Sequence, residues 1–330
     1  MKCVLLLDEE RYQKIFLPET LAKLSEEMEV IYRPHRKMDP DNTREMISGA
    51  DIAITSWDSV KMEKEILDAA PGLKLVAHAA GSVKPIVSQE FILRQIKITS
   101  AAPALGVGVA DSILGAIIMM GKRLKEQIIS VDSGDWVAKE GNRAIEMFQA
   151  RIGIVGAGFV GRHLIKLLRN FDVASLWVYD PYLSSQEASG LGSEKKTLEE
   201  IFSTCDYICL CAPVTSETTG MINADLIRRI KDNAVFINYA RSALVDEAFL
   251  VAELQTGRFC AAIDVAAVEP PPADHPLRRL PNVLFTPHIA GAINRNIYRN
   301  GQYASREVIN FSQGKPLIHQ VDLSKLETIA

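Results

Sequence analysis

The feature that most constrains the fold is a glycine-rich turn, Gly156-Ala157-Gly158-Phe159-Val160-Gly161, which joins a short apolar run to an amphipathic segment. A strand that enters a helix through three glycines suits a pyrophosphate. The first glycine permits the tight turn, the second lets the backbone approach the phosphates, and the third lets the helix pack closely on the strand. The N-terminus of the helix then offers N–H groups and a positive dipole end to the anion. The pattern predicts a strand at 152–155, a helix at 160–168 and a dinucleotide site between them.

An acid at the end of the next predicted strand favours one cofactor. The apolar run 176–179 ends in Asp180, roughly twenty residues after the glycines, where a carboxylate binds the ribose hydroxyls. That carboxylate would repel the additional phosphate of NADP, and residues 181–184 contain no arginine to neutralise it. We therefore expect NAD. The alternative interpretation of Asp180 is an acid that ends a strand and faces solvent.

Composition is typical of a soluble enzyme with two domains. The chain has 330 residues, 48% of them apolar, which is about twice the length of a typical domain. A formal charge of −4 and the absence of a basic run argue against a nucleic-acid partner. The apolar run after Met1-Lys2-Cys3 is too short for a signal peptide, and 113–120 is too short to span a bilayer and predicts a buried helix. We expect a cytoplasmic protein without a membrane segment.

The five cysteines show no extracellular disulfide pattern and no C-x-x-C pair. Three of them lie in apolar runs typical of strands, so reduced and buried thiols are expected. Cys209 and Cys211 lie two residues apart and would face the same side of a strand, but no further ligands follow nearby. We therefore expect no metal site.

The position of the glycine turn indicates the domain organisation. About 150 residues precede it, and they alternate helical segments with apolar strands predicted at 3–7, 30–32, 52–55 and 73–77. A long apolar helix from about Val107 to Leu124 would cross into the cofactor domain, and a helix at 294–311 would return from it. The sequence thus predicts an α/β protein with two doubly wound parallel sheets and a cleft at their junction. A flavodoxin-like substrate domain (1–101 and 292–330) would flank a Rossmann NAD-binding domain (102–291).

Charged residues follow three more predicted strands, at 235–238, 261–265 and 283–285. Arg241, Asp264, Glu269 and His288 all lie near the carboxyl ends of these strands, where doubly wound sheets bind their ligands. Hydride transfer to a 2-keto acid needs a cation for the carboxylate and carbonyl, and a proton donor for the developing alkoxide. Arg241 and His288 offer these functions, and Glu269 could orient the imidazole. The alternatives are an ion-paired arginine, a loop-capping glutamate and a structural histidine.

Taken together, these motifs and their order resemble the D-2-hydroxyacid dehydrogenase family, which contains D-3-phosphoglycerate, D-glycerate (hydroxypyruvate), D-lactate and formate dehydrogenases. The resemblance covers nearly the whole chain and is carried by the glycine turn with Asp180-Pro181-Tyr182, by 238–247, by Asp264-Val265 with Glu269-Pro270, and by Pro287-His288-Ile289-Ala290-Gly291.

The resemblance implies roles for individual residues. Arg241 would bind and polarise the substrate, Glu269 and His288 would form the acid–base pair, and Asp264 would contact the nicotinamide amide. A homodimer built largely through the cofactor domains is also implied. The residues expected to bind the cofactor are Gly156, Gly158, Phe159, Val160, Gly161, Asp180, Pro213, Tyr239, Ala240, Asp264 and Gly291.

The chain departs from the family pattern in two places. Ser242 stands where the family usually has glycine after the arginine. The substrate loop is Ala79-Ala80-Gly81-Ser82-Val83-Lys84, with a lysine where an acid is common. The N–H groups of Gly81, Ser82 and Val83 would still hold a substrate carboxylate. Lys84 hints at an acidic or phosphorylated substituent, with a solvated lysine as the alternative. Formate dehydrogenases carry glutamine where this chain has Glu269, which disfavours that branch.

Three functions remain open at this point. The first is an NAD-dependent dehydrogenase of a small 2-hydroxy acid, such as a glyoxylate or hydroxypyruvate reductase. The second is a phosphoglycerate dehydrogenase in a short form, since about forty residues follow His288. The third is a non-catalytic, NAD-sensing corepressor-like relative, which turnover would distinguish from an enzyme.

Overall fold

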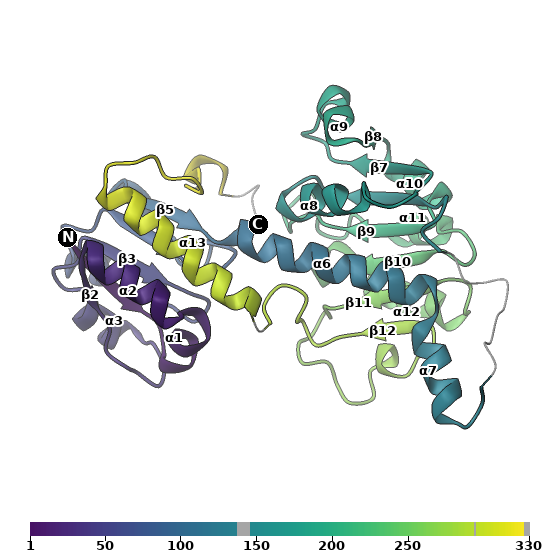
Figure 1. Cartoon of the computed structure of the whole chain (residues 1–330), viewed down its shortest axis with the longest axis horizontal. Helices are drawn as coiled ribbons and strands as arrows, with labels where there is room; N and C mark the ends of the chain where they lie inside the picture. Colours follow the sequence, from purple (N-terminus) through teal and green to yellow (C-terminus); the bar gives the residue numbers. More distant parts are fainter. Residues whose placement is uncertain (137–145, 294, 327–330) are drawn as a thin grey trace. The chain divides into compact units, whose positions relative to one another are not determined.

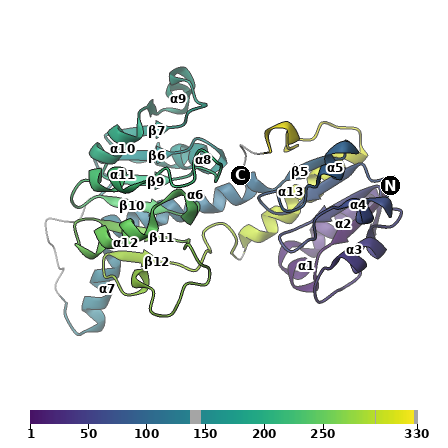
Figure 2. The same ribbon diagram turned by 180° about the vertical axis from the view of Figure 1, so that it is seen from behind.

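A computed structural model describes residues 1–136, 146–293 and 295–326 of the chain (Figure 1, and from behind in Figure 2). Two compact units are present: residues 1–105 with 292–330, and residues 106–291. The first division falls inside helix α6 (Ala102–Gly121), slightly beyond the 101/102 boundary expected from sequence. Asn294, the expected start of the return helix, lies outside the described residues; that helix, α13, is Arg295–Ser312.

The first unit is built on a parallel sheet of five strands in the order β2-β1-β3-β4-β5, which is the flavodoxin-like order. The strands are β1 (Lys2–Leu6), β2 (Glu29–Ile31), β3 (Ile52–Thr55), β4 (Leu75–His78) and β5 (Lys97–Ser100). The helices are α1 (Glu9–Ile15), α2 (Pro18–Glu27), α3 (Pro40–Ile47), α4 (Lys64–Asp68) and α5 (Gln89–Leu93), together with α13. Helix α13 packs on α1, α2 and β4, so the C-terminal segment completes the N-terminal core.

The second unit contains a parallel sheet of seven strands in the order β12-β11-β10-β9-β6-β7-β8. These strands are β6 (Arg151–Val155), β7 (Ser175–Tyr179), β8 (Glu194–Lys195), β9 (Tyr207–Leu210), β10 (Val235–Asn238), β11 (Cys260–Ile263) and β12 (Val283–Phe285). Strand order reverses between β6 and β9, which pair from Ile152 with Tyr207 to Val155 with Leu210. This is the Rossmann arrangement, and its switch point is where such sheets bind ligands. The predicted fold class is therefore confirmed.

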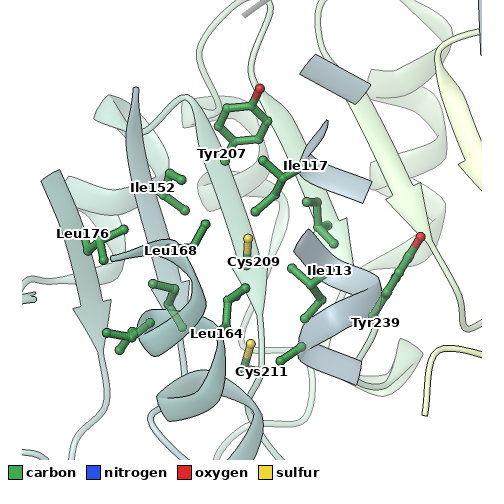
Figure 3. Packing of buried hydrophobic residues seen from close by; sticks show 14 of the residues in the cluster. Ile113, Ile117, Ile152, Leu164, Leu168, Leu176, Tyr207, Cys209, Cys211 and Tyr239 are labelled. Atoms are coloured by element: carbon green, nitrogen blue, oxygen red, sulfur yellow. The ribbon is translucent and has the colours of Figure 1, made fainter. Parts of the chain in front are cut away.

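Helices cover both faces of the second sheet: α6, α7 (Leu124–Asp132), α8 (Phe159–Leu168), α9 (Ser185–Leu191), α10 (Leu198–Thr204), α11 (Ala224–Arg229) and α12 (Glu247–Gln255). Figure 3 shows Ile113 and Leu164 in one buried cluster with Cys209 of β9 and with Cys211, which follows this strand. Burying one such aliphatic side chain stabilises the fold by about 2 kcal/mol. Cys209 and Cys211 share this cluster, and burial raises the pKa of the Cys211 thiol to about 12. No group of three or more metal-ligating side chains occurs among the described residues.

Helix α6 is the one described helix that is long and apolar enough to cross a membrane by length and composition. It begins five residues before the expected Val107 and ends at Gly121. Half of its most apolar window is buried, and Ile113 and Ile117 are fully buried against the second sheet. This packing is that of a core helix.

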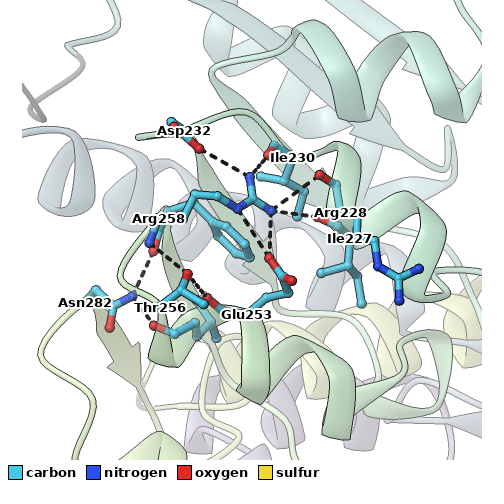
Figure 4. Close-up of polar contacts among 10 residues, drawn as sticks. Ile227, Arg228, Ile230, Asp232, Glu253, Thr256, Arg258 and Asn282 are labelled. Carbon is cyan, nitrogen blue, oxygen red and sulfur yellow. Dashed lines mark hydrogen bonds and ion pairs between the residues drawn. The ribbon is translucent and has the colours of Figure 1, made fainter.

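Arg258 makes several polar contacts at the amino-end edge of the second sheet, as Figure 4 shows. Its guanidinium donates to the carbonyls of Ile227 and Ile230 at the end of α11 and pairs with Glu253 at 2.9 Å. A cation there complements the negative end of the helix dipole. The side chain of Asn282 donates to two further carbonyls of this region. These contacts lie at the amino ends of β11 and β12, away from the residues predicted to bind ligands.

Candidate active site

The glycine turn has the geometry that a pyrophosphate site requires. Gly156 has a φ of 103°, and a Cβ there would lie 2.7 Å from the nitrogen of Ala212. A Cβ on Gly161 would lie 2.0 Å from the oxygen of Gly156, so the close approach of α8 to the turn requires glycine. Gly158, the N-cap of α8, is different, because a Cβ there would meet no atom within 4 Å. The space beside the helix N-terminus is therefore open to a phosphate, and the residues fit a dinucleotide.

Asp180 is fixed beside this turn. Its Oδ2 accepts the N–H of Ala157 at 2.8 Å, and its Oδ1 accepts the N–H of Tyr182 at 2.9 Å. The carboxylate therefore lies at the edge of the glycine turn, where the sequence analysis expects the ribose. Arg162, which the sequence analysis did not consider, donates from Nε to the oxygen of Ala157 at 2.8 Å. Its guanidinium is thus held near the turn as well.

Arg241 follows β10 on a turn that Asn238 closes. Asn238 is 2% exposed; its side chain accepts the N–H of Ala240 at 3.1 Å and donates to the carbonyl of Arg241 at 3.0 Å. The arginine side chain is exposed, and its Nη1 donates to the carbonyl of Ala240. Ser242 does not have a positive φ, so the backbone at this departure from the family pattern does not require glycine. Arg241 was predicted from the sequence, whereas the positioning role of Asn238 was not.

Asp264 holds the segment that carries the histidine. It is 1% exposed, its Oδ1 accepts the N–H of Ile289 at 3.0 Å, and its Oδ2 accepts the N–H of Ala290 at 2.8 Å. The hydroxyl of Thr286 also donates to Oδ1, at 2.6 Å. Burial, together with the charge of Asp264, raises the pKa of Tyr239 to about 12. Asp264 thus braces the turn after β12, and its contact with a nicotinamide amide stays a prediction.

Glu269 and His288 lie in direct contact. Nδ1 of His288 is 2.6 Å from Oε2 of Glu269, whose Oε1 accepts the N–H of Ala266 at 3.0 Å. Burial raises the pKa of Glu269. The hydrogen bonds from His288 and Ala266 and the nearby charge of Arg241 together lower it by more, so the net shift is downward. Glu269 is therefore ionised at neutral pH. His288 has a φ of 53°, in the left-handed region that few non-glycine residues adopt.

This geometry leaves Nε2 of the imidazole as the nitrogen that can exchange a proton with a ligand. The carboxylate fixes the ring orientation through Nδ1. The charge of Arg241 also contributes to lowering the pKa of Glu269, so both Arg241 and His288 lie close enough to act on this carboxylate. The structure therefore brings together, in the second unit, a cation, an ionised carboxylate and an imidazole.

The predicted substrate loop belongs to the first unit and follows β4. The N–H groups of Gly81, Ser82 and Val83 donate to no acceptor within the described chain. Ser100 anchors the loop, because its Oγ donates to the carbonyl oxygen of Gly81 at 2.5 Å. The loop thus has free donors for a carboxylate, and their contribution to the same site as Arg241 stays a prediction.

A buried histidine that the sequence analysis missed supports this loop. His78 is 3% exposed, its Nδ1 lies 2.9 Å from Oγ1 of Thr55, and its ring is hydrogen-bonded to the backbone of Ser82. Burial lowers its pKa to about 4, against the raising effect of the Ser82 contact. The sequence shows that His78 ends an apolar run directly before the loop, but its contact with Thr55 arises only when β3 and β4 pair.

Comparison with known proteins agrees with this geometry. Residues 114–290 match the sequence profile described as "D-isomer specific 2-hydroxyacid dehydrogenase, NAD binding domain". A D-3-phosphoglycerate dehydrogenase from Archaeoglobus fulgidus is 29% identical over 276 residues, which are 83% of this chain and 52% of the relative. The chain therefore spans about half the length of the phosphoglycerate dehydrogenases that it matches.

Two further proteins match along nearly their whole length. A glyoxylate reductase from Pyrococcus furiosus is 28% identical over 315 residues, covering 92% of this chain and 93% of the relative. The crystal structure of a phosphoglycerate oxidoreductase from Rhizobium etli superposes with a TM-score of 0.82 at 24% identity, covering 98% of this chain and 99% of that one. At 24% identity, the match to the Rhizobium etli structure shows a shared fold and nothing about function.

Proposed function

This chain belongs to the D-isomer specific 2-hydroxyacid dehydrogenase family, and we propose that it transfers hydride reversibly between NAD(H) and a small 2-keto or 2-hydroxy acid. The observation that carries the proposal is the contact of 2.6 Å between Glu269 and His288, with the charge of Arg241 close enough to act on Glu269. A pair of this kind can supply the proton that reduction of a carbonyl consumes.

Each of the three residues has one task in this reaction. Arg241 binds the substrate carboxylate and polarises the keto group, so that negative charge develops on the carbonyl oxygen beside a cation. His288 donates the proton from Nε2 to that oxygen, and in the oxidative direction accepts it. Glu269 stabilises the imidazolium through Nδ1. When bound, NADH supplies the hydride.

The residues that would hold the dinucleotide favour NAD over NADP. The open space beside Gly158 and the helix N-terminus would take the pyrophosphate, and Asp180 would accept the ribose hydroxyls. The carboxylate of Asp180 would repel a 2′-phosphate. The guanidinium of Arg162 near the turn moderates this preference, because a cation there could approach the same phosphate.

For the substrate we propose a small, polar 2-keto acid such as glyoxylate or hydroxypyruvate. The match to the glyoxylate reductase along 93% of its length supports this choice. The alternative is 3-phosphohydroxypyruvate, supported by Lys84 beside the loop and by the relatives named D-3-phosphoglycerate dehydrogenase. A non-catalytic NAD sensor would bind the cofactor without turning over any of these acids.

The substrate is tested by following NADH oxidation with glyoxylate, hydroxypyruvate, pyruvate, phenylpyruvate, 2-ketoglutarate and 3-phosphohydroxypyruvate, and by chiral analysis of a product. We expect a small polar acid to give the highest kcat/KM and the D product. If 3-phosphohydroxypyruvate leads, Lys84→Ala should raise its KM more than that of glyoxylate. A preference for phenylpyruvate, or an L product, would contradict the proposal.

We further propose a homodimer formed through the second unit. Support comes from α7, on which Ile128, Ile129 and Val131 are each about half exposed, an apolar surface that association would cover. Sedimentation velocity should show a dimer, and Ile128→Asp with Ile129→Asp should shift it towards monomer.

We also propose that the protein works in the cytoplasm, which agrees with five free cysteines and can be tested by cell fractionation.

A further inference from the structure

Glu269 lies in the loop of residues 264–278, and two carboxylates, those of Glu269 and Glu247, accept backbone N–H groups of this loop. The consecutive N–H groups of Ala266 and Ala267 donate to different acids: Ala266 to Oε1 of Glu269 at 3.0 Å, and Ala267 to Oε2 of Glu247 at 2.9 Å. The first contact lies within the loop, whereas the second comes from outside it. Glu247 is the first residue of α12 and follows the segment that begins with Arg241. It therefore connects two of the segments that form the site.

A second histidine joins Glu247 to the other side of the loop. Nε2 of His275, just before the 3-10 turn η2 (Pro276–Arg278), lies 3.5 Å from Oε1 of Glu247. The two side chains are 18% and 21% exposed. The imidazole also packs on Phe285, with ring centroids 6.3 Å apart, and Phe285 is the last residue of β12, the strand that leads to His288. The pair thus contacts both the loop of Glu269 and the strand before His288.

The loop between these contacts is closed on itself. The side chain of Arg278 donates from Nε to the carbonyl of Pro272 at 2.9 Å and from Nη2 to the carbonyl of Pro271 at 2.8 Å. These contacts close residues 271–278, the part of the loop that follows Glu269 and contains His275. Nδ1 of His275 is buried and has no hydrogen-bond partner among the described residues. The polar contact that this ring makes within the described chain is therefore the one between Nε2 and Glu247.

We propose that Glu247 and His275 are a positioning pair, which fixes the loop so that Glu269 stays in hydrogen-bond contact with His288. Neither residue touches the reacting atoms. This inference rests on the proposed function, because it matters for proton transfer by His288. If Glu269 moves away, the imidazole loses the hydrogen bond at Nδ1 that fixes its orientation and the negative charge beside it. A displacement of about 1 Å in such a contact reduces rates by roughly tenfold to a hundredfold.

The kinetic test compares Glu247→Ala and His275→Gln with a matched control. Glu253→Gln is suitable, because Glu253 also lies on α12, is paired with a cation and is 22% exposed, but does not contact the loop. We expect Glu247→Ala to lower kcat about tenfold or more and to leave NADH affinity unchanged. It should also lower the pH at which the rate of reduction falls to half of its maximum. Glu247→Gln should retain more activity, because its amide oxygen can still accept the N–H of Ala267. Glu253→Gln should leave kcat and the pH profile unchanged.

A double-mutant cycle shows whether Glu247 acts through Glu269. If it does, Glu247→Ala added to Glu269→Gln should cost less than about twofold in kcat. Costs that multiply, or a Glu247→Ala pH profile equal to that of the unmutated protein, would overturn the proposal.

Hydrogen–deuterium exchange gives a readout that does not depend on activity. In Glu247→Ala, peptides covering residues 264–278 should exchange about tenfold faster than in the unmutated protein, while those of β6 and β9 should not change. Unchanged exchange in the loop would contradict the positioning role. Absence of turnover in the unmutated protein would instead contradict the proposed function, so the two failures are distinguishable.

Discussion

The buried His78 makes the stability of the first unit depend on pH. Burial lowers its pKa from the ordinary 6.5 to about 4, so the folded protein keeps the ring neutral where an unfolded chain would protonate it. Above pH 7 both states are neutral and no stability is lost. As pH falls below about 6.5, the unfolded chain binds a proton that the folded chain binds only near pH 4. Stability is therefore lost on acidification between these two values.

The size of the effect follows from the difference between the two pKa values. One unit corresponds to 1.36 kcal/mol, so the full loss is about 3 kcal/mol, of which about 2 kcal/mol is reached by pH 5. Replacement by glutamine removes the titrating group but retains polar atoms that can reach Thr55. His78→Gln should destabilise the protein at pH 8, and its disadvantage should shrink by about 2 kcal/mol at pH 5.

The assay is urea unfolding at both pH values, with hydrogen-exchange pulse labelling of the β4 peptide, because two units can unfold in separate steps. His35→Gln is the control: it replaces a less buried histidine of the same unit and measures the effect of removing a histidine that does not contact Thr55. If the difference between His78→Gln and the unmutated protein is equal at pH 5 and pH 8, the reasoning is refuted.

Two further predictions concern the second unit. Asp180→Ala should narrow the preference for NADH over NADPH in kcat/KM, because it removes the carboxylate near Gly158 that would repel a 2′-phosphate. Equal kcat/KM with both cofactors in the unmutated protein would refute this role of Asp180. Glu269→Gln should move the pH profile of reduction downward, because Glu269 has a lowered pKa, and the variant removes this negative charge beside the proton donor. An unmoved profile in rate measurements between pH 5 and 9 would exclude this role of Glu269.

Apolar strands could be predicted from the sequence, including the edge strand β12 at Val283–Phe285, whereas the polar edge strands β5 and β8 could not. Val235–Asn238 and Ile52–Thr55 were predicted with the bounds that the structure has, because parallel strands covered on both faces are continuous apolar runs. Strand β5 (Lys97–Ser100) was missed, since it lies at the edge of the first sheet and mixes polar and apolar residues. Strand β8 (Glu194–Lys195) has two exposed residues and no apolar signal.

For the site, order along the chain was enough to select Arg241, Glu269 and His288, because all three follow strands of one sheet. The supporting residues could not be chosen in the same way. The contact of Glu247 with the N–H of Ala267 depends on how a loop folds back onto α12, which no local pattern encodes. His78 was overlooked for a similar reason, because its burial and its contact with Thr55 arise only when β3 and β4 pair.

The central claim is that His288, oriented by Glu269, transfers the proton that accompanies hydride transfer. The most direct test is His288→Ala, measured for turnover with the best keto acid and for NADH affinity by fluorescence titration. Turnover should fall by about a hundredfold or more, while NADH affinity stays within about twofold. Full turnover in His288→Ala would contradict the account.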